Sequence, residues 1–440
     1  MIKVLFVSLG CDKNRVDTEF MLGQLAGKAE FTDDESEADV IVVNTCCFIG
    51  DAEEESIDTI LEMAQYRMEG KCRALIVCGC LAQRYQDEVR KEIPEVDAVL
   101  GTSSTQELAR AIETVLGKEE KYASFRPLEG IEPHEKRILT GCGYYAYLKI
   151  AEGCDKRCTY CIIPSVRGSY RSVPLEDLVR QARALAEGGV RELILVAQET
   201  TLYGVDLYGE KSLYRLLDEL NRIEGLDWIR ILYCYPEEID DRLIASIKKN
   251  EKVCHYLDMP IQHINDTVLR RMGRRTCRRD IENIVEKLRE EIPDIALRTT
   301  IICGFPGETE EQHEELMEFL NGAEFDRLGA FTYSAEDGTP AAEMPDQIPE
   351  QTKENWKADV MELEEEIIAD CNEELIGREF DVIIEGELPE EHAFVGRTYR
   401  DAPDVDGYVF IRTDEALMSG DFARVRITGA YEYDLIGELI

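Results

Sequence analysis

Three cysteines in the middle of the chain have a spacing that suits metal chemistry: Cys154, Cys158 and Cys161 form a C-x3-C-x2-C triplet. Three thiolates on one short loop can hold three corners of a cubane iron–sulfur cluster and leave one iron open. The alternative is a structural zinc ion, which takes four protein ligands. The nearest further candidates, Cys142 and His134, lie outside this loop. The triplet therefore favours an iron–sulfur cluster over zinc and over ordinary buried cysteines.

An open iron of this kind can be chelated by S-adenosylmethionine through its amino and carboxylate groups. One electron from the cluster then cleaves the sulfonium and gives a carbon radical that abstracts hydrogen from an unactivated C–H bond. The protein ligates, orients and shields the reactants. The triplet resembles the signature of the radical S-adenosylmethionine superfamily. The chain is therefore expected to be an enzyme.

Length and cysteine usage indicate the setting of this chemistry. The chain has 440 residues, enough for two or three domains, and residues 1–10 suit a first strand better than a signal peptide. No apolar run reaches the ~18 residues that a membrane span requires. Fifteen cysteines in a long chain of this kind indicate a reducing, cytoplasmic compartment, where cysteines bind metal or lie in cores.

The chain is strongly acidic, with a formal net charge of −41. Nucleic-acid binders present basic patches, because neutralising phosphates supplies most of their affinity. The charge therefore disfavours a nucleic acid as the main partner and favours a basic one. The alternative is that the charge serves solubility in general.

The first 117 residues alternate short apolar runs with amphipathic stretches, which predicts an open parallel α/β sheet covered on both faces. The predicted strands and helices are, in chain order, residues 3–9, 15–25, 39–43, 53–68 and 73–77. Each predicted strand is followed by a cysteine: Cys11, Cys46 and Cys80. Because the carboxyl ends of parallel strands share one edge of a sheet, these cysteines are expected to converge as a second three-thiolate site. The alternative is unrelated core cysteines. That role is expected for three others: Cys47, Cys72 and Cys78.

The rest of the chain predicts two further domains after a polar connector at residues 118–139. Residues 140–372 contain six βα units, which fit an open or partial (β/α) barrel with its site at the carboxyl ends of the strands. The predicted strands are residues 147–150, 193–197, 228–232, 255–259, 297–302 and 328–333. Residues 373–440 predict a small five-stranded β-barrel. Its predicted strands are residues 380–385, 393–398, 408–411, 423–428 and 435–440.

A cysteine-bearing α/β domain, a C-x3-C-x2-C barrel and a terminal β-barrel, in this order, resemble the radical S-adenosylmethionine methylthiotransferases over nearly the whole chain. These transferases replace a C–H bond by C–S–CH3, and their modules are an N-terminal cluster domain, a radical core and a TRAM domain. The resemblance implies one 4Fe–4S cluster on Cys11, Cys46 and Cys80. It implies a second one on Cys154, Cys158 and Cys161, with two S-adenosylmethionine molecules used per turnover.

Two branches of this family act on different substrates: an aspartate of a small-subunit ribosomal protein, or an adenosine of tRNA. Residues 8–19, 44–56 and 402–408 resemble the ribosomal-protein (RimO-type) branch, whose target is the β-carbon of an aspartate in protein S-twelve. The Tyr-Gly-Cys run and the terminal Asn-Arg pair that are typical of the tRNA branch are absent. The tRNA adenosine methylthiotransferase is therefore the alternative function.

Charge gives an independent test of the branch. Residues 375–440 carry fifteen acidic against six basic side chains, a net of −9, which suits a basic ribosomal protein better than tRNA. The one dense basic run, residues 270–279, could contact phosphate or form a solvated helix end.

The resemblance also implies cofactor contacts beyond the cysteines, and no catalytic residue is assigned besides the cluster ligands. Three residues follow a predicted strand where radical enzymes bind the amino group of the cofactor: Gln198, Glu199 and Thr200. Gly304 and Gly307 lie in a run similar to the glycine-containing cofactor segment, although a plain strand-to-helix turn explains them equally well. His263 is either a proton donor or part of a structural hydrogen bond.

The expected partners are a basic small-subunit ribosomal protein as substrate and a reductant such as flavodoxin or ferredoxin. No membrane is expected, and nucleic acid only within the ribosome or under the tRNA alternative. The lack of a heptad or an apolar stripe favours a monomer. A third hypothesis is a non-catalytic iron–sulfur or zinc scaffold that holds metal without cleaving the cofactor. The pairing of two three-cysteine sites argues against it.

Overall fold

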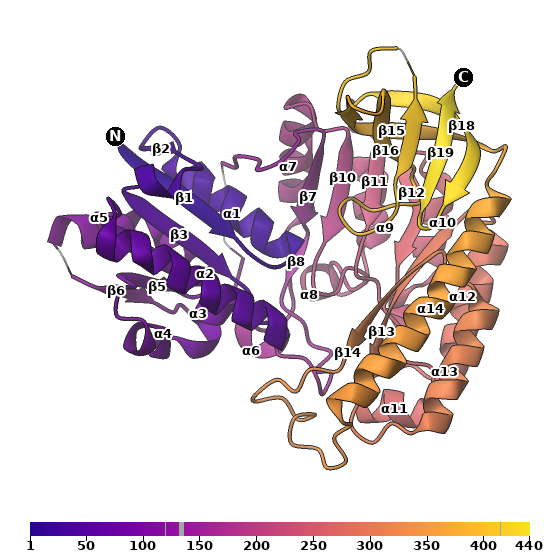
Figure 1. Cartoon of the computed structure of the whole chain (residues 1–440), viewed down its shortest axis with the longest axis horizontal. Helices are drawn as coiled ribbons and strands as arrows, with labels where there is room; N and C mark the ends of the chain where they lie inside the picture. Colours follow the sequence, from indigo (N-terminus) through magenta and orange to yellow (C-terminus); the bar gives the residue numbers. More distant parts are fainter. Residues whose placement is uncertain (119, 132–135, 414) are drawn as a thin grey trace. The chain divides into compact units, whose positions relative to one another are not determined.

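The computed structural model describes residues 1–118, 120–131, 136–413 and 415–440. Glu119 and residues 132–135 of the expected connector, His134 among them, lie outside the described residues. The chain divides into two compact units (Figure 1). The first comprises Met1–Thr140, Ala151–Ser172 and Ser334–Ala342, and the second comprises Gly141–Ile150, Val173–Tyr333 and Glu343–Ile440. None of the described helices is both long and apolar enough to cross a membrane.

The first unit contains a six-stranded sheet in the order β2-β1-β3-β4-β5-β6, and neighbouring strands are parallel. Its strands are β1 (Ile2–Ser8), β2 (Ala29–Phe31), β3 (Val40–Thr45), β4 (Ala74–Gly79), β5 (Ala98–Leu100) and β6 (Tyr122–Ser124). Every residue of β3 and β4 is buried, as expected for strands that helices cover on both faces. The predicted parallel sheet is confirmed, with three further short strands, of which β6 lies in the segment expected as a connector.

Helices cover both faces of this sheet. They are α1 (Asp12–Leu25), α2 (Gly50–Glu69), α3 (Cys80–Tyr85), α4 (Asp87–Glu92), α5 (Leu108–Lys118) and α6 (Ile163–Arg167), with 3-10 turns at Glu35–Glu37 and Thr105–Glu107. Met21 of α1 and Ile112 of α5 join one core cluster, and Ile60 of α2 and Leu81 of α3 join the other. Each face of the sheet therefore has its own apolar layer.

The second unit contains an open six-stranded sheet in the order β14-β13-β12-β11-β10-β7, again with parallel neighbours. Its strands are β7 (Tyr145–Lys149), β10 (Glu192–Val196), β11 (Trp228–Ile231), β12 (Val253–Asp258), β13 (Ala296–Cys303) and β14 (Arg327–Thr332). The six predicted strands and the open (β/α) architecture are confirmed. The short strands β8 (Ala151–Glu152) and β9 (Arg171–Ser172) pair separately, in the first unit.

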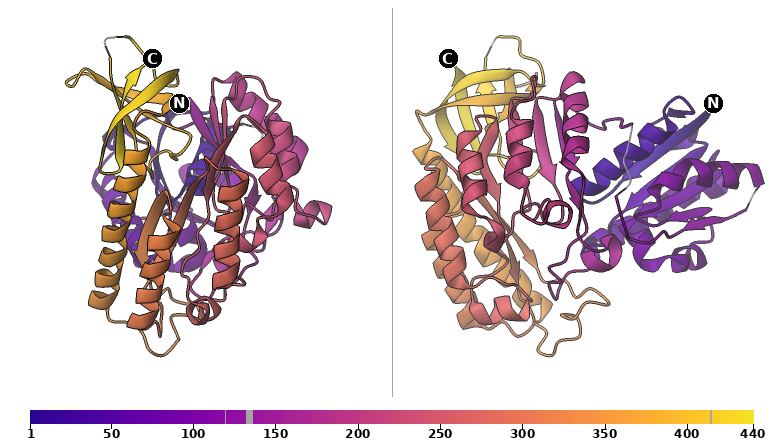
Figure 2. Two further views of the ribbon diagram at one scale, coloured as in Figure 1. Left: turned by 90° about the vertical axis from the view of Figure 1, so that its right-hand side faces the viewer. Right: turned by 180° about the vertical axis from the view of Figure 1, so that it is seen from behind.

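The helices of the second unit alternate with these strands. They are α7 (Leu175–Glu187), α8 (Val205–Tyr208), α9 (Leu213–Leu220), α10 (Asp241–Lys249), α11 (Asp266–Arg271), α12 (Arg278–Glu291), α13 (Glu310–Ala323) and α14 (Glu350–Glu374), with a 3-10 turn at Pro236–Glu238. In α7 the buried residues Leu178, Val179, Ala182 and Leu185 follow the helical period, so one stripe faces the core. Figure 2 shows α14 running beside β14 toward the terminal strands.

The terminal strands close into a five-stranded barrel in the order β15-β16-β17-β19-β18, as predicted. They are β15 (Glu379–Leu388), β16 (Ala393–Arg397), β17 (Val409–Arg412), β18 (Phe422–Tyr431) and β19 (Asp434–Leu439). Inward-facing residues such as Val382, Ile411 and Val425 are fully buried and form the core of the barrel. Each described strand of the barrel therefore pairs with two neighbours.

Buried ion pairs attach this barrel to the open sheet of the same unit. Glu192 of β10 accepts from Arg230 Nε at 2.7 Å and from Arg397 Nη2 at 2.6 Å, and all three side chains are inaccessible to solvent. Two further pairs join the loop between β16 and β17 to the sheet: Arg327 with Asp401, and Arg298 with Asp406. The loop at residues 402–408, which resembled the RimO-type branch, therefore has a structural role in docking the barrel.

Candidate active site

The strands that precede the first set of cysteines are neighbours in the sheet of the first unit. β1 pairs with β3, and β3 pairs with β4. Cys11 is the N-cap of α1, Cys46 follows β3 directly, and Cys80 begins α3 directly after β4. Burial, with a smaller contribution from the Cys11 and Cys46 thiols, raises the pKa of the Cys80 thiol to about 12. The structure thus places the three thiols at one sheet edge, and their role as iron ligands stays a prediction.

Two glycines allow the cysteine-bearing segments to approach one another closely. Gly10 has a φ of +78°, and a Cβ there would lie 2.5 Å from the Cβ and 2.8 Å from the Sγ of Cys46. Gly79 has a φ of +94°, and a Cβ there would lie 2.6 Å from the carbonyl oxygen of Thr45. Glycine adopts this conformation without steric cost, and it alone leaves the space that the neighbouring segment fills.

Buried polar side chains hold the backbone around these cysteines. Asn14 Nδ2 donates to the carbonyl oxygens of Leu9 and Thr45, both at 3.0 Å. Ser56 Oγ accepts from the backbone N–H of Cys46 at 3.0 Å and donates to its carbonyl oxygen at 2.8 Å. Sequence reasoning missed these residues, because a polar residue on a helix carries no sign that its partner is the carboxyl end of a distant strand.

Arg167 was also missed, although it lies six residues after the triplet. Its Nε donates to Cys80 Sγ at 3.3 Å, and its Nη1 donates to Asp17 Oδ2 at 2.7 Å. The same guanidinium bonds Asn14 and Glu152. Its positive charge lowers the pKa of the Cys80 thiol, which opposes the effect of burial. A buried cation therefore lies in direct contact with one of the predicted ligands.

Three other cysteines of the first unit lie in its core. Cys78 Sγ lies 3.8 Å from Met21 Sδ, in the apolar layer on the α1 face of the sheet. Cys72 Sγ donates to the carbonyl oxygen of Ala74 at 3.2 Å. Cys47 is inaccessible to solvent and packs in the layer under α2 and α3. These positions agree with the core role expected for them.

The second set of cysteines lies on the loop between β8 and α6. The backbone N–H of Cys154 donates to the carbonyl oxygen of Gly168 at 3.1 Å, and that of Cys161 donates to Cys158 at 3.1 Å. Gly153 has a φ of +80°, and a Cβ there would lie 2.2 Å from a carbonyl oxygen of the segment that follows α6. The start of the loop thus packs closely against the segment that follows α6. Cys154 and Cys158 are buried, and Cys161 is partly exposed.

Both sets of cysteines belong to the first compact unit. α6 follows the triplet directly and contacts α3, whose first residue is Cys80. Ile162, the N-cap of this short helix, and Val166 within it join the apolar layer that contains Leu81 of α3. From the sequence, the triplet was expected after the first strand of the core domain. In the structure, the loop that carries the triplet belongs to the compact unit of the N-terminal sheet.

The donors of both sets fit iron–sulfur clusters. Thiolates are the ligands that such clusters take, and three of them leave one iron open in each cluster. No group of three or more His, Cys, Asp or Glu side chains among the described residues could hold a metal ion directly. The thiols that follow β1, β3 and β4 are of the donor type that an iron–sulfur cluster takes.

The predicted cofactor residues after β10 lie at the carboxyl edge of the second sheet. Thr200 Oγ1 donates to the carbonyl oxygen of Leu232 at 2.5 Å, and this bond ties the end of β10 to the end of β11. Glu199 is buried and accepts from the backbone N–H of Thr201 at 3.0 Å, whereas Gln198 is partly exposed. These bonds shape the strand ends, and contact of the three residues with S-adenosylmethionine stays a prediction.

Gly304 and Gly307 lie in the turn between β13 and α13. Both have positive φ values, +75° and +74°. A Cβ on Gly304 would lie 2.4 Å from Cγ of Lys353, and one on Gly307 would lie 2.1 Å from a guanidinium nitrogen of Arg271. In the structure, these glycines allow two long cationic side chains to approach the backbone: Lys353 at Gly304 and Arg271 at Gly307. Their contact with the cofactor stays a prediction.

His263 takes part in a structural hydrogen-bond network. Its Nδ1 accepts from the backbone N–H of Asn265 at 2.9 Å, so Nε2 carries the proton that it donates to Glu308 Oε1 at 3.2 Å. Glu308 Oε2 in turn accepts from the backbone N–H groups of Gly304 and Phe305 at 2.8 and 2.9 Å. Both ring nitrogens are engaged, which supports the structural interpretation of His263 over the role of proton donor.

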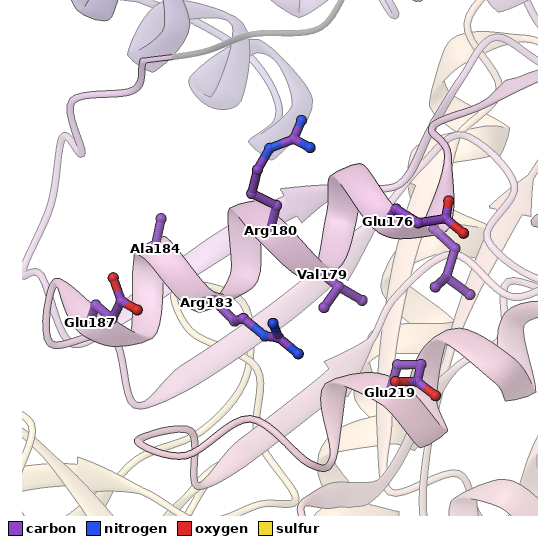
Figure 3. Close-up of a pocket in the computed structure, with 8 residues that line it drawn as sticks. Glu176, Val179, Arg180, Arg183, Ala184, Glu187 and Glu219 are labelled. Carbon is purple, nitrogen blue, oxygen red and sulfur yellow. The ribbon is translucent and has the colours of Figure 1, made fainter.

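A surface pocket of about 530 Å³ lies on the second unit (Figure 3). It is lined by charged side chains of α7, including Glu176, Arg180 and Arg183, and by Glu219 of α9. None of the predicted ligands or cofactor residues lines it. The lining consists mainly of charged side chains of both signs on two helices, so this pocket is a feature of the helix surface.

Three family models match successive parts of the chain. Residues 3–101 match a family described as uncharacterized protein family UPF0004, residues 148–320 match the radical SAM superfamily, and residues 376–440 match the TRAM domain. The matches follow the order of the three modules that the sequence resembled.

Solved structures of low sequence identity share the fold. The radical S-adenosylmethionine methyltransferase TsrM of Kitasatospora setae, with cobalamin and a [4Fe-4S] cluster bound, has a TM-score of 0.55 at 16% identity and covers 77% of this chain and 76% of its own. The cobalamin-dependent radical enzyme OxsB has a TM-score of 0.51 at 13% identity and covers 84% of this chain and 56% of its own. Similarity at this level supports the architecture only.

Curated relatives match nearly the full length. A protein of Lachnoclostridium phytofermentans named ribosomal protein uS12 methylthiotransferase RimO is 57% identical over 438 residues, which is 99% of each chain. Proteins of the same name from Acetivibrio thermocellus and Geobacter sulfurreducens are 50% and 51% identical, and each match covers 100% of this chain and 98% of the relative. The chain therefore belongs to the RimO family of methylthiotransferases, which are radical S-adenosylmethionine transferases with 4Fe–4S clusters.

Proposed function

We propose that this protein replaces a hydrogen on the β-carbon of an aspartate in ribosomal protein uS12 by a methylthio group. The observation that carries the proposal is one compact unit with two sets of three cysteines, one at a sheet edge and one on the loop before α6, in a chain of the RimO family. The two S-adenosylmethionine molecules and the clusters, when bound, supply the electron, the hydrogen abstraction, the sulfur and the methyl group.

The chain's own residues hold and shield these groups. One cluster would be held by Cys11, Cys46 and Cys80. The other would be held by Cys154, Cys158 and Cys161. Burial of Cys154 and Cys158 keeps water away from part of the second set, and Ser56 keeps the backbone of Cys46 in place. S-adenosylmethionine would bind at the carboxyl edge of the second sheet. The residues that would contact it there are Gln198, Glu199, Thr200, Gly304 and Gly307.

Charge supports a basic protein substrate over tRNA. Of the six basic residues in the barrel segment, Arg397 and Arg400 are buried in ion pairs with the sheet. Arg424 and Arg426 both pair with Glu379 on the barrel surface. Few cations remain to bind phosphate, and the net charge of −41 attracts a basic ribosomal protein.

The remaining partners follow from the same chemistry. Each cleavage of S-adenosylmethionine consumes an electron, so a one-electron donor such as flavodoxin or ferredoxin would serve as reductant. The protein would act as a monomer in the cytoplasm, where ribosomal proteins are made and thiolates stay reduced.

Anaerobic reconstitution followed by iron and sulfide analysis tests the two cluster sites. The wild type should bind about eight irons, and the Cys154→Ala, Cys158→Ala, Cys161→Ala triple variant about four, with retained cubane absorption. Cys78→Ala, which removes a core thiol, is the matched control and should keep the full iron content. Zinc in place of iron, or a single cluster in the wild type, would refute the two-cluster site.

Mass spectrometry of substrates tests the reaction. Reconstituted enzyme with S-adenosylmethionine and reductant should add one methylthio group to purified uS12 or to small ribosomal subunits. A uS12 variant with Asn in place of the modified aspartate should gain nothing. Methylthio-adenosine in tRNA together with unmodified uS12 would favour the tRNA alternative and overturn the proposal.

A further inference from the structure

One buried cation touches both cysteine-bearing parts of the first unit. Arg167 ends α6, the helix that follows the triplet, and its side chain is 2% accessible. Its partners lie on three other elements: Asn14 and Asp17 on α1, Cys80 at the start of α3, and Glu152 on β8. A single guanidinium thus joins the triplet's helix to the elements that carry the strand-end cysteines.

The contact with Cys80 is directed at its sulfur. Arg167 Nε lies 3.3 Å from Cys80 Sγ, within the range of an N–H···S hydrogen bond. The other side of the guanidinium is held by Asp17 at 2.7 Å and by Glu152 at 3.4 Å. These carboxylates orient the planar group, so that Nε–H points at the sulfur. A thiolate bound to iron keeps lone pairs that can accept this bond.

Hydrogen bonds to cluster sulfurs are one of the factors that set reduction potentials. Reduction adds negative charge to a cluster and its thiolates, and a nearby N–H donor with a positive charge stabilises that charge. The bond from Arg167 to Cys80 should therefore favour the reduced form of the cluster at the strand ends.

We infer that Arg167 is a positioning residue that raises the reduction potential of the cluster held by Cys11, Cys46 and Cys80. The inference rests on the proposed function, since it needs a cluster at these cysteines. It adds a role for a residue outside both sets of ligands. In this role, the helix after one cluster loop adjusts the redox properties of the other cluster.

The test uses the full chain with Cys154→Ala, Cys158→Ala and Cys161→Ala, which leaves only the strand-end cluster. The midpoint potential of that cluster is measured by anaerobic redox titration with electron paramagnetic resonance. Arg167→Lys keeps a positive charge beside Asp17 but removes the Nε–H donor, and it should shift the midpoint to a more negative value. A second variant, Arg167→Met, removes the donor and the positive charge together. It should shift the midpoint further in the same direction, because no cation then offsets the negative charge that reduction adds.

Arg137→Lys is the matched control. Arg137 is another buried arginine of the first unit, and it pairs with Glu19 on the same helix α1. If Arg167 only supported α1, the two lysine variants would change the midpoint alike. An unchanged midpoint in both Arg167 variants, with the cluster fully bound, would overturn the inference and leave the proposed function standing. Absence of any cluster in the triple-cysteine background would overturn the proposed function itself.

Discussion

Glu364 on α14 gives the second unit a stability that depends on pH. The carboxyl group is 1% accessible, and burial raises its pKa to about 8, although the charge of Arg327 opposes this rise. Between its unfolded pKa of 4.5 and this value, the folded protein binds more protons than the unfolded chain, so stability falls as pH rises through this window. The full effect is about 5 kcal/mol above pH 8, at about 1.4 kcal/mol per pKa unit.

Glu364→Gln keeps the shape of the side chain and removes the titration. The variant should match the wild type near pH 5 and exceed it by several kcal/mol at pH 9, because the wild type must then bury a charge. Urea denaturation followed by tryptophan fluorescence measures this difference. The chain has two tryptophans, Trp228 on β11 and Trp356 on α14, and both belong to the second unit. The signal therefore reports the unit in which Glu364 lies.

Glu366→Gln is the control on the same helix, since that side chain is exposed. It should change the free energy of unfolding by less than about 0.5 kcal/mol at every pH. A constant difference between Glu364→Gln and the wild type from pH 5 to 9 would show that the carboxyl does not titrate in this window. A variant less stable than the wild type at pH 9 would refute the reasoning outright.

Two further changes test the docking of the barrel and the close approach of Cys46 to Gly10. Arg397→Met removes a fully buried partner of an ion pair and should cost about 3–5 kcal/mol of unfolding free energy, against at most about 1 kcal/mol for the exposed Arg424→Met. Equal losses in the same fluorescence assay would contradict the docking role. Gly10→Ala places a Cβ against Cys46 and should reduce the bound iron after reconstitution from about eight to about four. Gly27→Ala has the same positive φ with open space around it, so it should keep the iron, and an equal loss there would point to backbone strain instead.

The architecture could be read from local patterns. The apolar runs before Cys46 and Cys80 are strands in which every residue is buried, and such strands appear in a sequence as continuous apolar segments. The five strands of the terminal barrel could be predicted as short runs separated by Gly, Pro and Asp turns. The strands that were missed have two or three residues each, too few to show a period: β2, β5, β6, β8 and β9.

Polar contacts between distant residues could not be read in this way. His263 was open to two interpretations until the structure showed Glu308 at one ring nitrogen and the backbone of Asn265 at the other. The sequence indicated a tight turn at Gly304 and Gly307. Only the structure showed that Lys353 and Arg271 fill the space that a side chain would take at these positions.

The sequence by itself determined the number, type and spacing of the thiol donors and the strands whose ends carry them. Both depend on residues that are neighbours along the chain. Only the tertiary structure decided that Arg167 reaches Cys80 across 87 residues and that Arg397 reaches Glu192 across 205. A buried ion pair or hydrogen bond requires two side chains to meet with correct geometry in the folded core, and no local period encodes where a partner so far along the chain will lie.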